Sequence, residues 1–182
     1  MTPRVLLLAA GHGRRAGGPK AWQERGGKPM LAAQLEFLLT MLPPSKITVS
    51  IQEPWLERCL ALSPDVRWVP VNPDASPLAS LIALIRAGRV ERSFVYHVDM
   101  PIFDAAVFGK LAELQCDAVP SFKNKRGHPV LLTVPTLLDI LRLNPAADRL
   151  DEYLGRRGIE DVPVESDLIL KNENEPIEVN RP

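Results

Sequence analysis

Short apolar runs alternate with longer amphipathic segments over the first two thirds of the chain. Runs of strand length cover residues 5–9, 47–51, 66–71 and 94–98. Segments with helical periodicity cover residues 30–41, 54–62, 78–88 and 104–115, each with proline or glycine near an end. This alternation is typical of a parallel sheet with helices packed on its faces, and it predicts about four βα units.

The pattern becomes less regular after residue 115. A short strand at 117–120, a polar turn at 123–127 and a strand at 129–133 predict antiparallel additions. Helical stretches at 135–143 and 148–157, a strand at 161–164 and a polar tail at 168–182 follow. Because the prolines mark element ends rather than a linker, we predict a single domain over residues 1–182. The expected fold is a Rossmann-like three-layer α/β sandwich with a mostly parallel sheet and antiparallel additions in the C-terminal half.

Composition and charge limit the classes of partner. The 22 basic and 22 acidic side chains cancel, so no overall field favours nucleic acid or an anionic membrane. No apolar run approaches the ~20 residues of a membrane-spanning helix. The two cysteines, Cys59 and Cys116, match no metal-binding spacing. We therefore expect a cytoplasmic protein without nucleic-acid or membrane partners, and the sequence does not indicate its oligomeric state.

The first apolar run leads into a glycine-rich, cationic segment at residues 11–20. Glycines at positions 11, 13, 17 and 18 allow backbone N–H groups to approach a ligand closely. Arg14, Arg15 and Lys20 add positive charge that suits phosphate groups. The segment is therefore interpreted as a nucleotide-phosphate site, and the alternative is a surface turn that binds nothing.

Two familiar phosphate-binding loops fit this segment poorly. A dinucleotide-binding loop needs a helix that starts within it, whereas Gly17-Gly18-Pro19 would interrupt such a helix. A Walker A loop needs lysine directly after the last glycine and then serine or threonine. Here Pro19 follows the last glycine and Ala21 follows the lysine. The loop is instead expected to stay open through Lys28.

Several short motifs resemble those of small nucleotidyltransferases. The sequence Leu-Ala-Ala-Gly at 8–11, Arg15, Gly17, Pro19-Lys20 and the sequence at 27–30 resemble their N-terminal signature. The similarity is strongest to the molybdenum cofactor guanylyl- and cytidylyltransferases, which carry a MobA-like NTP transferase domain. Motifs at 77–79, 98–101, 127–129 and 172–176 follow in the same order, so the resemblance covers nearly the whole chain. Gly13 and Ala16 replace the usual Ser and Met, and we expect both changes to be mild.

The resemblance implies that an acceptor phosphate attacks the α-phosphorus of an NTP and that pyrophosphate leaves. It assigns Lys20 to the charge that develops at the α-phosphate and Arg15 to the leaving phosphates, as catalytic residues. The implied nucleotide-binding residues are Leu8, Ala9, Ala10, Gly11, Gly13, Arg14, Lys20, Asp74, Ser76 and Ser80. Helix capping is the alternative role for the last three.

A carboxylate follows the strand at 94–98. Because ligands bind beyond the carboxyl ends of parallel strands, Asp99 and the glycine-rich loop are expected to face one crevice. Mg²⁺ favours one or two carboxylates plus substrate phosphates, so Asp99 is the predicted metal ligand. Asp104 is better placed to cap the next helix. The resemblance implies a second ligand at Asn174, where related cytidylyltransferases have aspartate and guanylyltransferases asparagine; alternatively, residues 172–176 cap the last helix.

Base and acceptor are less strongly indicated. Ala10 and the Gly-His-Pro motif at 127–129 resemble the CTP-dependent branch, and the motifs at 77–79 and 172–174 resemble the GTP-dependent one, so CTP is slightly favoured. Gly127 and His128 are predicted to contact a small phosphorylated acceptor, with molybdopterin favoured, or His128 fixes a turn. Alternative functions are a cytidylyltransferase for a small sugar, polyol or amino-alcohol phosphate, and a nucleotide-binding protein without turnover. His97 is expected to be packed in the core, and the role of His12 is open.

Overall fold

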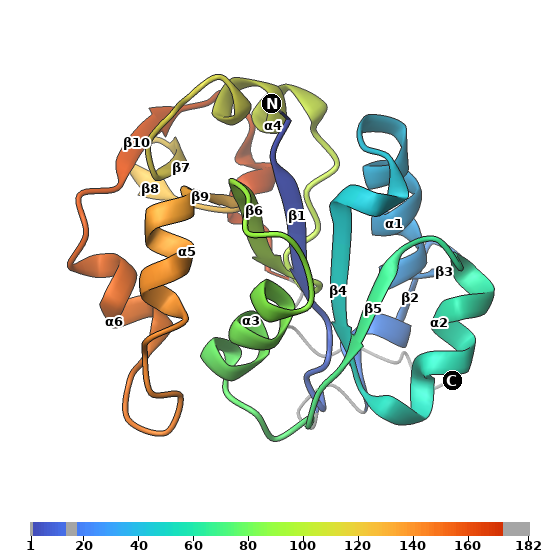
Figure 1. Ribbon diagram of the computed structural model, residues 1–182. Coiled ribbons are helices and arrows are strands. Elements are labelled where there is room, and N and C mark those ends of the chain that lie inside the picture. The colour runs from blue at the N-terminus through green and yellow to red at the C-terminus, as the bar shows by residue number, and fades with distance from the viewer. Residues whose placement is uncertain (1, 14–17, 173–182) are drawn as a thin grey trace, which may run out of the picture.

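An eight-stranded sheet organises the fold, seen in the computed structural model that describes residues 2–13 and 18–172 (Figure 1). The strand order is β10-β7-β9-β6-β1-β4-β5, and β8 pairs with β7 beside this path. Its strands are β1 (Arg4–Leu8), β4 (Ile47–Ile51), β5 (Arg67–Pro70), β6 (Ser93–His97), β7 (Ala118–Phe122), β8 (Lys125–Arg126), β9 (Val130–Leu132) and β10 (Glu160–Pro163). The first four are mutually parallel, as the βα alternation predicts.

Helices cover both faces of the sheet (Figure 1). One face packs against α1 (Met30–Met41), α2 (Leu56–Leu62) and α4 (Ala105–Ala112), and the other against α3 (Pro77–Arg86), α5 (Val134–Ile140) and α6 (Leu150–Gly155). Strand side chains alternate between the two layers, so Leu7 joins the first core and Leu8 the second. Every residue of β1 is buried because helices cover it on both sides. The predicted three-layer α/β sandwich is confirmed.

The C-terminal half adds the expected antiparallel strands. β9 runs antiparallel to both β6 and β7, and β8 forms a hairpin with β7. The hairpin turns at Lys123 and Asn124, whose φ angles are +48° and +63°. β10 returns parallel to β7 at the edge of the sheet. The mostly parallel sheet with antiparallel additions is therefore present as predicted.

Four segments differ from the sequence-based expectation. The helix expected at 54–62 begins as a 3-10 turn, η4 (Glu53–Trp55), before α2. The helices expected at 135–143 and 148–157 are shorter, because Asn144 and Asp148 close a turn between them: the backbone N–H of each donates to the other residue. The segment from Pro19 to Lys28 is not open. It forms η2 (Lys20–Trp22) and a ribbon of β2 (Glu24–Arg25) with β3 (Lys28–Pro29).

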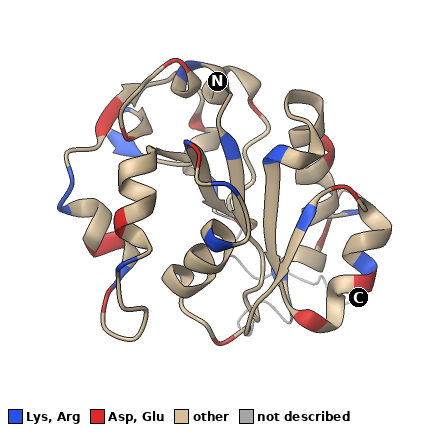
Figure 2. Ribbon diagram, viewed as in Figure 1, with Lys and Arg blue, Asp and Glu red and all other residues tan. Residues whose placement is uncertain are grey.

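Two short 3-10 helices complete the elements, η3 (Pro44–Lys46) and η5 (Asp167–Leu170). Basic and acidic side chains are interspersed over the ribbon in Figure 2, in line with the balanced composition. Across residues 2–13 and 18–172, no helix is both long and apolar enough to cross a membrane.

Candidate functional site

The carboxyl ends of the central strands β1, β4 and β6 meet at one edge of the sheet. Leu8, the last residue of β1, aligns with Ser50 of β4 and with His97 of β6. Beyond it, the Val98 N–H donates to the Leu8 carbonyl at 2.9 Å, and the Ala9 N–H donates to the Ser50 Oγ at 3.1 Å. The loop after β1 and the residues after β6 therefore leave the sheet side by side.

Lys20 and Asp99 form an ion pair at this edge. Lys20 Nζ, from η2, donates to Asp99 Oδ2 at 2.7 Å, and the two side chains are 16% and 18% exposed. The N-cap of α4 is Asp104, whose Oδ1 accepts from the Ala106 N–H at 3.0 Å. As predicted, Asp104 and not Asp99 caps this helix. The structure brings together the proposed catalytic cation and the proposed metal ligand, and both can be reached by solvent.

The described part of the glycine-rich loop folds back on itself. The Gly18 N–H donates to the Gly13 carbonyl at 3.2 Å, and Gln52 Nε2 donates to the Gly11 carbonyl at 3.2 Å. Gly13 has a φ of +60°, and a Cβ added there would lie 1.8 Å from the Gly18 carbonyl oxygen. Glycine at position 13 is therefore a requirement of this loop conformation rather than a mild replacement for serine. Arg14 and Arg15 lie outside the described residues.

The other predicted nucleotide-binding residues lie where this loop begins and in the segment that leads into α3. Leu8, Ala9 and Ala10 are buried where it begins. His12 Nε2 lies 2.9 Å from Asp74 Oδ1, a contact that joins this loop to the one after β5. Ser76 caps α3, which was the alternative role expected for it: its hydroxyl accepts from the Ala79 N–H at 3.1 Å. Ser80 is buried within the same helix.

The described residues offer one carboxylate, Asp99, at the strand edge beside Lys20. No group of three or more His, Cys, Asp and Glu side chains that could hold a metal occurs within residues 2–13 and 18–172. Mg²⁺ is commonly held by one or two carboxylates, with substrate phosphates and water completing its coordination. The carboxylate oxygens of Asp99 are ligands of the kind that Mg²⁺ prefers. Lys20 lies beside them and can bind the phosphate that would complete the coordination. The second predicted ligand, Asn174, lies outside the described residues.

A cavity of about 440 Å³ lies on the α3 face of the sheet. Its wall includes His97, His128 and Val130, together with Leu150 and Leu154 of α6. His97 follows Val95 on the same face of β6, and β9 pairs Val130 with Val95, which brings His128 to the end of β6. His97 thus lines a cavity and is not enclosed in the core as expected, because β6 ends there.

Both imidazoles of this cavity are shifted toward the neutral form. The pKa of His128 is lowered to about 4, mostly by burial and also by His97, while Asp99 partly opposes the shift. Burial also lowers the pKa of His97, where Lys20 acts in the same direction and Asp99 opposes. The histidines therefore carry no charge at neutral pH, and the cavity is electrostatically coupled to the Lys20–Asp99 pair.

Gly127, predicted to contact the acceptor, packs against η5. A Cβ added there would lie 2.3 Å from the Ile169 carbonyl oxygen. The neighbouring His128 N–H donates to the same carbonyl at 3.0 Å, and the Gly127 N–H donates to Pro120 O at 2.9 Å. These contacts set where the His128 side chain leaves the backbone, and they explain why glycine precedes it.

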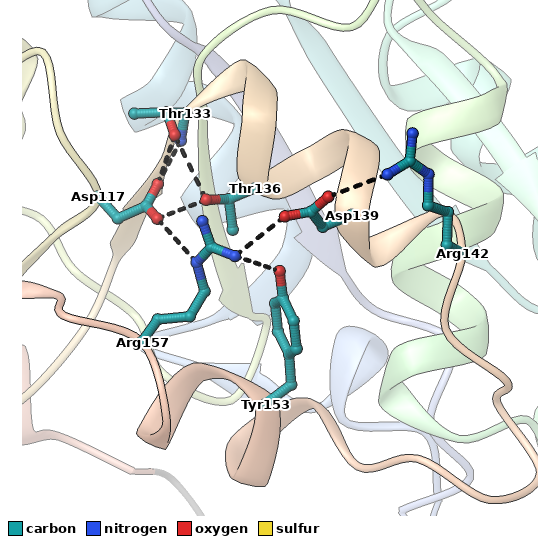
Figure 3. Close-up of polar contacts among 7 residues, drawn as sticks. All are labelled: Asp117, Thr133, Thr136, Asp139, Arg142, Tyr153 and Arg157. Atoms are coloured by element: carbon teal, nitrogen blue, oxygen red, sulfur yellow. Dashed lines mark hydrogen bonds and ion pairs between the residues drawn. The ribbon is translucent and has the colours of Figure 1, made fainter.

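A polar network holds the α6 wall of the cavity in place (Figure 3). Asp117, 8% exposed, accepts from both the N–H and the hydroxyl of Thr133 at 2.7 Å and also from the Thr136 hydroxyl. Arg157 Nε lies 3.4 Å from the same carboxylate. The Nη1 atom of Arg157 donates to Asp139 of α5 at 3.1 Å and to the Tyr153 hydroxyl of α6 at 2.8 Å.

Sequence reasoning missed both this network and the α6 wall. The one signal in the sequence was the spacing of Leu150 and Leu154, four residues apart, which indicates a buried helix face and not a cavity.

Comparison with known proteins places the chain among nucleotidyltransferases. The sequence model of the MobA-like NTP transferase domain matches residues 5–162. A search of curated protein sequences found no significant match.

Among solved structures, the fold resembles Rv0371c from Mycobacterium tuberculosis H37Rv (19% identity, 94% of each chain, TM-score 0.75), which has also been solved as a complex with manganese (17% identity, 91% of this chain, 90% of that chain, TM-score 0.71). It also resembles the molybdopterin-guanine dinucleotide biosynthesis protein A of Archaeoglobus fulgidus (19% identity, 88% and 83% covered, TM-score 0.62). The CTP:phosphocholine cytidylyltransferase of Streptococcus pneumoniae is similar as well (17%, 95% and 94%, TM-score 0.65). At these identities the structural likeness shows the fold alone.

Proposed function

The chain belongs to the MobA-like NTP transferase domain family, and on this premise we propose that it transfers a nucleotidyl group from an NTP to a small phosphorylated acceptor. The observation that carries the proposal is the Lys20–Asp99 pair, at the edge where the glycine-rich loop leaves the sheet. An anion-binding cation and a metal-binding carboxylate are the two groups that such a transfer needs.

In the proposed reaction, an oxygen of the acceptor phosphate forms a bond to the α-phosphorus. The bond from that phosphorus to the bridging oxygen breaks, and pyrophosphate leaves with the electron pair. The nucleophile arrives ionised, so no general base is required. Lys20 binds and neutralises the α-phosphate as its charge grows, and Arg15 holds the leaving phosphates. The backbone of the loop after β1 orients the triphosphate.

Asp99 is the proposed ligand of Mg²⁺, with Asn174 as its second ligand. The bound ion would supply further positive charge for the phosphate oxygens. That Rv0371c has been solved as a complex with manganese supports the use of a divalent metal.

The finer assignments rest on motif resemblance. CTP is slightly favoured over GTP as the donor, and molybdopterin is the favoured acceptor in a cytoplasmic setting. Leu8, Ala9, Ala10, Gly11, Gly13, Arg14, Asp74, Ser76 and Ser80 are proposed to surround the nucleotide, and Gly127 and His128 the acceptor. The A. fulgidus relative supports the choice of molybdopterin.

The test is a substrate panel read by pyrophosphate release. CTP and GTP are each combined with Mg²⁺ and with molybdopterin, a methylerythritol phosphate, a sugar phosphate or phosphocholine. We expect release with one NTP and one acceptor class, and loss of release in Asp99→Asn, which keeps the shape of the side chain but removes its charge. Glu36→Gln serves as the control, because that carboxylate is exposed and pairs with Lys28 on the surface.

A second candidate is cytidylyl transfer to phosphocholine or a related small phosphate, which the similarity to the S. pneumoniae enzyme favours. The same panel separates it from the first. NTP binding without release for any acceptor would support the third possibility, a nucleotide-binding protein without turnover.

A further inference from the structure

Gln34 is a buried polar residue on the face of α1 that packs against the sheet. The other buried residues of this helix are apolar: Met30, Leu31, Ala32, Leu35 and Leu38. Gln34 is 1% exposed, and its Oε1 is buried without a hydrogen-bond partner among the described residues. A buried acceptor without a partner destabilises a fold, and an apolar side chain would avoid that loss. Packing alone therefore does not account for the carboxamide.

The donor end of the same carboxamide reaches the end of β6. Gln34 Nε2 donates to the Val98 carbonyl oxygen, which joins α1 to the first residue after the strand. The pairing of β6 with β1 ends at His97 and Leu8. Gln34 thus supplies a hydrogen bond to a carbonyl beyond the last paired residue of β6, directly before Asp99.

Val98 and Asp99 are the two central residues of a β-turn. The Met100 N–H donates to the His97 carbonyl at 3.0 Å and closes this turn. The carbonyl that Gln34 holds belongs to the central peptide of the turn, between Val98 and Asp99. Types I and II of the β-turn differ in the orientation of that peptide, and type II requires a positive φ at the third residue. The third residue here is Asp99.

Asp99 has the turn conformation with a negative φ. Among the described non-glycine residues, positive φ occurs only at Lys123 and Asn124. Rotation of the central peptide would give Asp99 a positive φ and redirect its carboxylate, which lies 2.7 Å from Lys20 Nζ. Aspartate tolerates positive φ better than most residues, so its own sterics restrain this rotation only weakly. A contact from outside the turn is needed to hold the carboxylate in place.

The same helix is also joined to the segment that carries Lys20. The Met30 N–H, at the start of α1, donates to the Gln23 carbonyl at 2.9 Å, and the Gln23 N–H donates to the Lys20 carbonyl at 3.1 Å. α1 therefore contacts the backbone beside both members of the Lys20–Asp99 pair.

We propose that Gln34 is a positioning residue for the reaction: its carboxamide locks the Val98–Asp99 peptide and so holds the Asp99 carboxylate beside Lys20, where a metal ion would bind. Gln34 acts through Asp99 and is not itself catalytic. The inference rests on the proposed function, and it adds to the site a residue from the buried face of α1.

The first test needs neither metal nor substrate. NMR of the whole protein follows the Asp99 amide, whose nitrogen belongs to the peptide that Gln34 holds. In Gln34→Met, which keeps the length of the side chain but removes the donor, we expect the Asp99 signal to broaden or split as the peptide samples both orientations. Leu35→Met is the matched control, because it alters a buried neighbour on the same helix without removing a hydrogen bond. It should leave the Asp99 signal unchanged.

Turnover separates positioning from a merely structural role. With the substrate pair that the wild type uses, Gln34→Met should lower kcat about 10- to 100-fold, as is common for residues that orient a metal ligand. The KM for the NTP should stay close to the wild-type value, because the glycine-rich loop is untouched. The Mg²⁺ concentration that gives half the maximal rate should rise. Leu35→Met should match the wild type in all three quantities.

A measurement on the wild type keeps the test independent of how the variant folds. The side-chain amide protons of Gln34 should exchange slowly with solvent, and exchange at the rate of a free carboxamide overturns the inference. So does an unchanged Asp99 signal in Gln34→Met, an equal effect of Leu35→Met, or a normal kcat in Gln34→Met.

Failure of the proposed function gives a different result. If the wild type releases no pyrophosphate with any substrate pair, or if Asp99→Asn retains release, nucleotidyl transfer through Asp99 is wrong. The Asp99 signal in Gln34→Met still decides whether Gln34 holds the turn. An altered signal without any turnover would leave Gln34 as a residue that orients Asp99 and would remove its role in the reaction.

Discussion

Lys20 Nζ lies 2.7 Å from Asp99 Oδ2, although the two residues are 79 positions apart in the chain. The pair forms because η2 returns to the sheet edge at which β6 ends. Each side chain fixes the other, so a cation and a carboxylate are held ready where charge would develop in a phosphoryl-type transfer. Such preorganisation costs no further rearrangement when substrate arrives.

Removal of the Lys20 ammonium should therefore lower turnover far more than it lowers stability. We expect Lys20→Ala to reduce kcat about 100- to 1,000-fold, measured by pyrophosphate release with the active substrate pair. Lys110→Ala, on the exposed face of α4, should retain normal turnover. Wild-type kcat in Lys20→Ala would show that this lysine is not the catalytic cation.

Restoring the family's serine at position 13 should harm this loop. Gly13→Ser places a Cβ at a φ of +60° and 1.8 Å from the Gly18 carbonyl oxygen. The conformation alone costs about 1–2 kcal/mol, so the loop must rearrange. We expect weaker CTP or GTP binding by calorimetric titration and a lower unfolding midpoint. Gly11→Ala has open space around its new methyl group and should unfold normally. Tighter nucleotide binding by Gly13→Ser would contradict the loop geometry.

Gly127→Ala tests packing against η5. Its methyl group would meet the Ile169 carbonyl at 2.3 Å, and such overpacking costs about 1–3 kcal/mol. Gly109→Ala, inside α4 and with nothing within 4 Å, should instead gain about 0.5–1 kcal/mol. Urea unfolding of both variants measures the difference. Equal stabilities would mean that residue 127 is not packed as the structure places it.

The buried Asp117 carboxylate should contribute strongly to stability. Asp117→Ala leaves the Thr133 N–H, the Thr136 hydroxyl and Arg157 without their shared acceptor, at a cost of about 2–4 kcal/mol. Asp161→Ala breaks an exposed pair with Arg126 and should cost less than about 1 kcal/mol. If only Asp161→Ala is destabilised, the buried network around Asp117 does not support the fold as the structure shows it.

His128 should make the protein less stable in mild acid. Its pKa is about 4 in the folded state, against 6.5 when exposed, so the unfolded chain binds more protons between those values. Stability is therefore complete above about pH 6.5 and decreases as the pH falls toward 4, by about 2 kcal/mol at pH 5. Urea unfolding at pH 7 and pH 5 measures this loss, which should be smaller in His128→Gln. If the loss of stability between pH 7 and pH 5 is the same in His128→Gln as in the wild type, groups other than His128 cause the acid sensitivity.

Local periodicity was enough to locate the longer strands and helices. The strand Ile47–Ile51 and the helix Met30–Met41 begin and end where the apolar pattern does. The apolar side chains of both elements pack in the same hydrophobic cluster, so the local pattern marks their bounds. The position of Asp99 near the end of a buried strand could be predicted for a similar reason, and Asp104 supplies the helix cap as expected.

The cavity and its supports depend on contacts between distant segments. His97, His128 and Leu150 come from three separate elements, and no local pattern places them on one wall. The Asp117–Arg157 contact likewise forms only when α6 packs near α5. The ribbon of β2 and β3 was missed because its strands are two residues long, too short for a period to be visible, although Gly26 and Gly27 at the turn have positive φ angles.

The reversed direction of β9 has a consequence for how substrate preference can evolve. Because β9 runs against β6, it begins where the parallel strands end, and the segment that leads into it stands on the opposite side of β6 from the glycine-rich loop. On the proposed function, the glycine-rich loop that binds the donor and the segment before β9 that contacts the acceptor lie on opposite sides of β6. Insertions or substitutions before β9, or in the connection from α5 to α6, could exchange one acceptor for another while the nucleotide half remains intact.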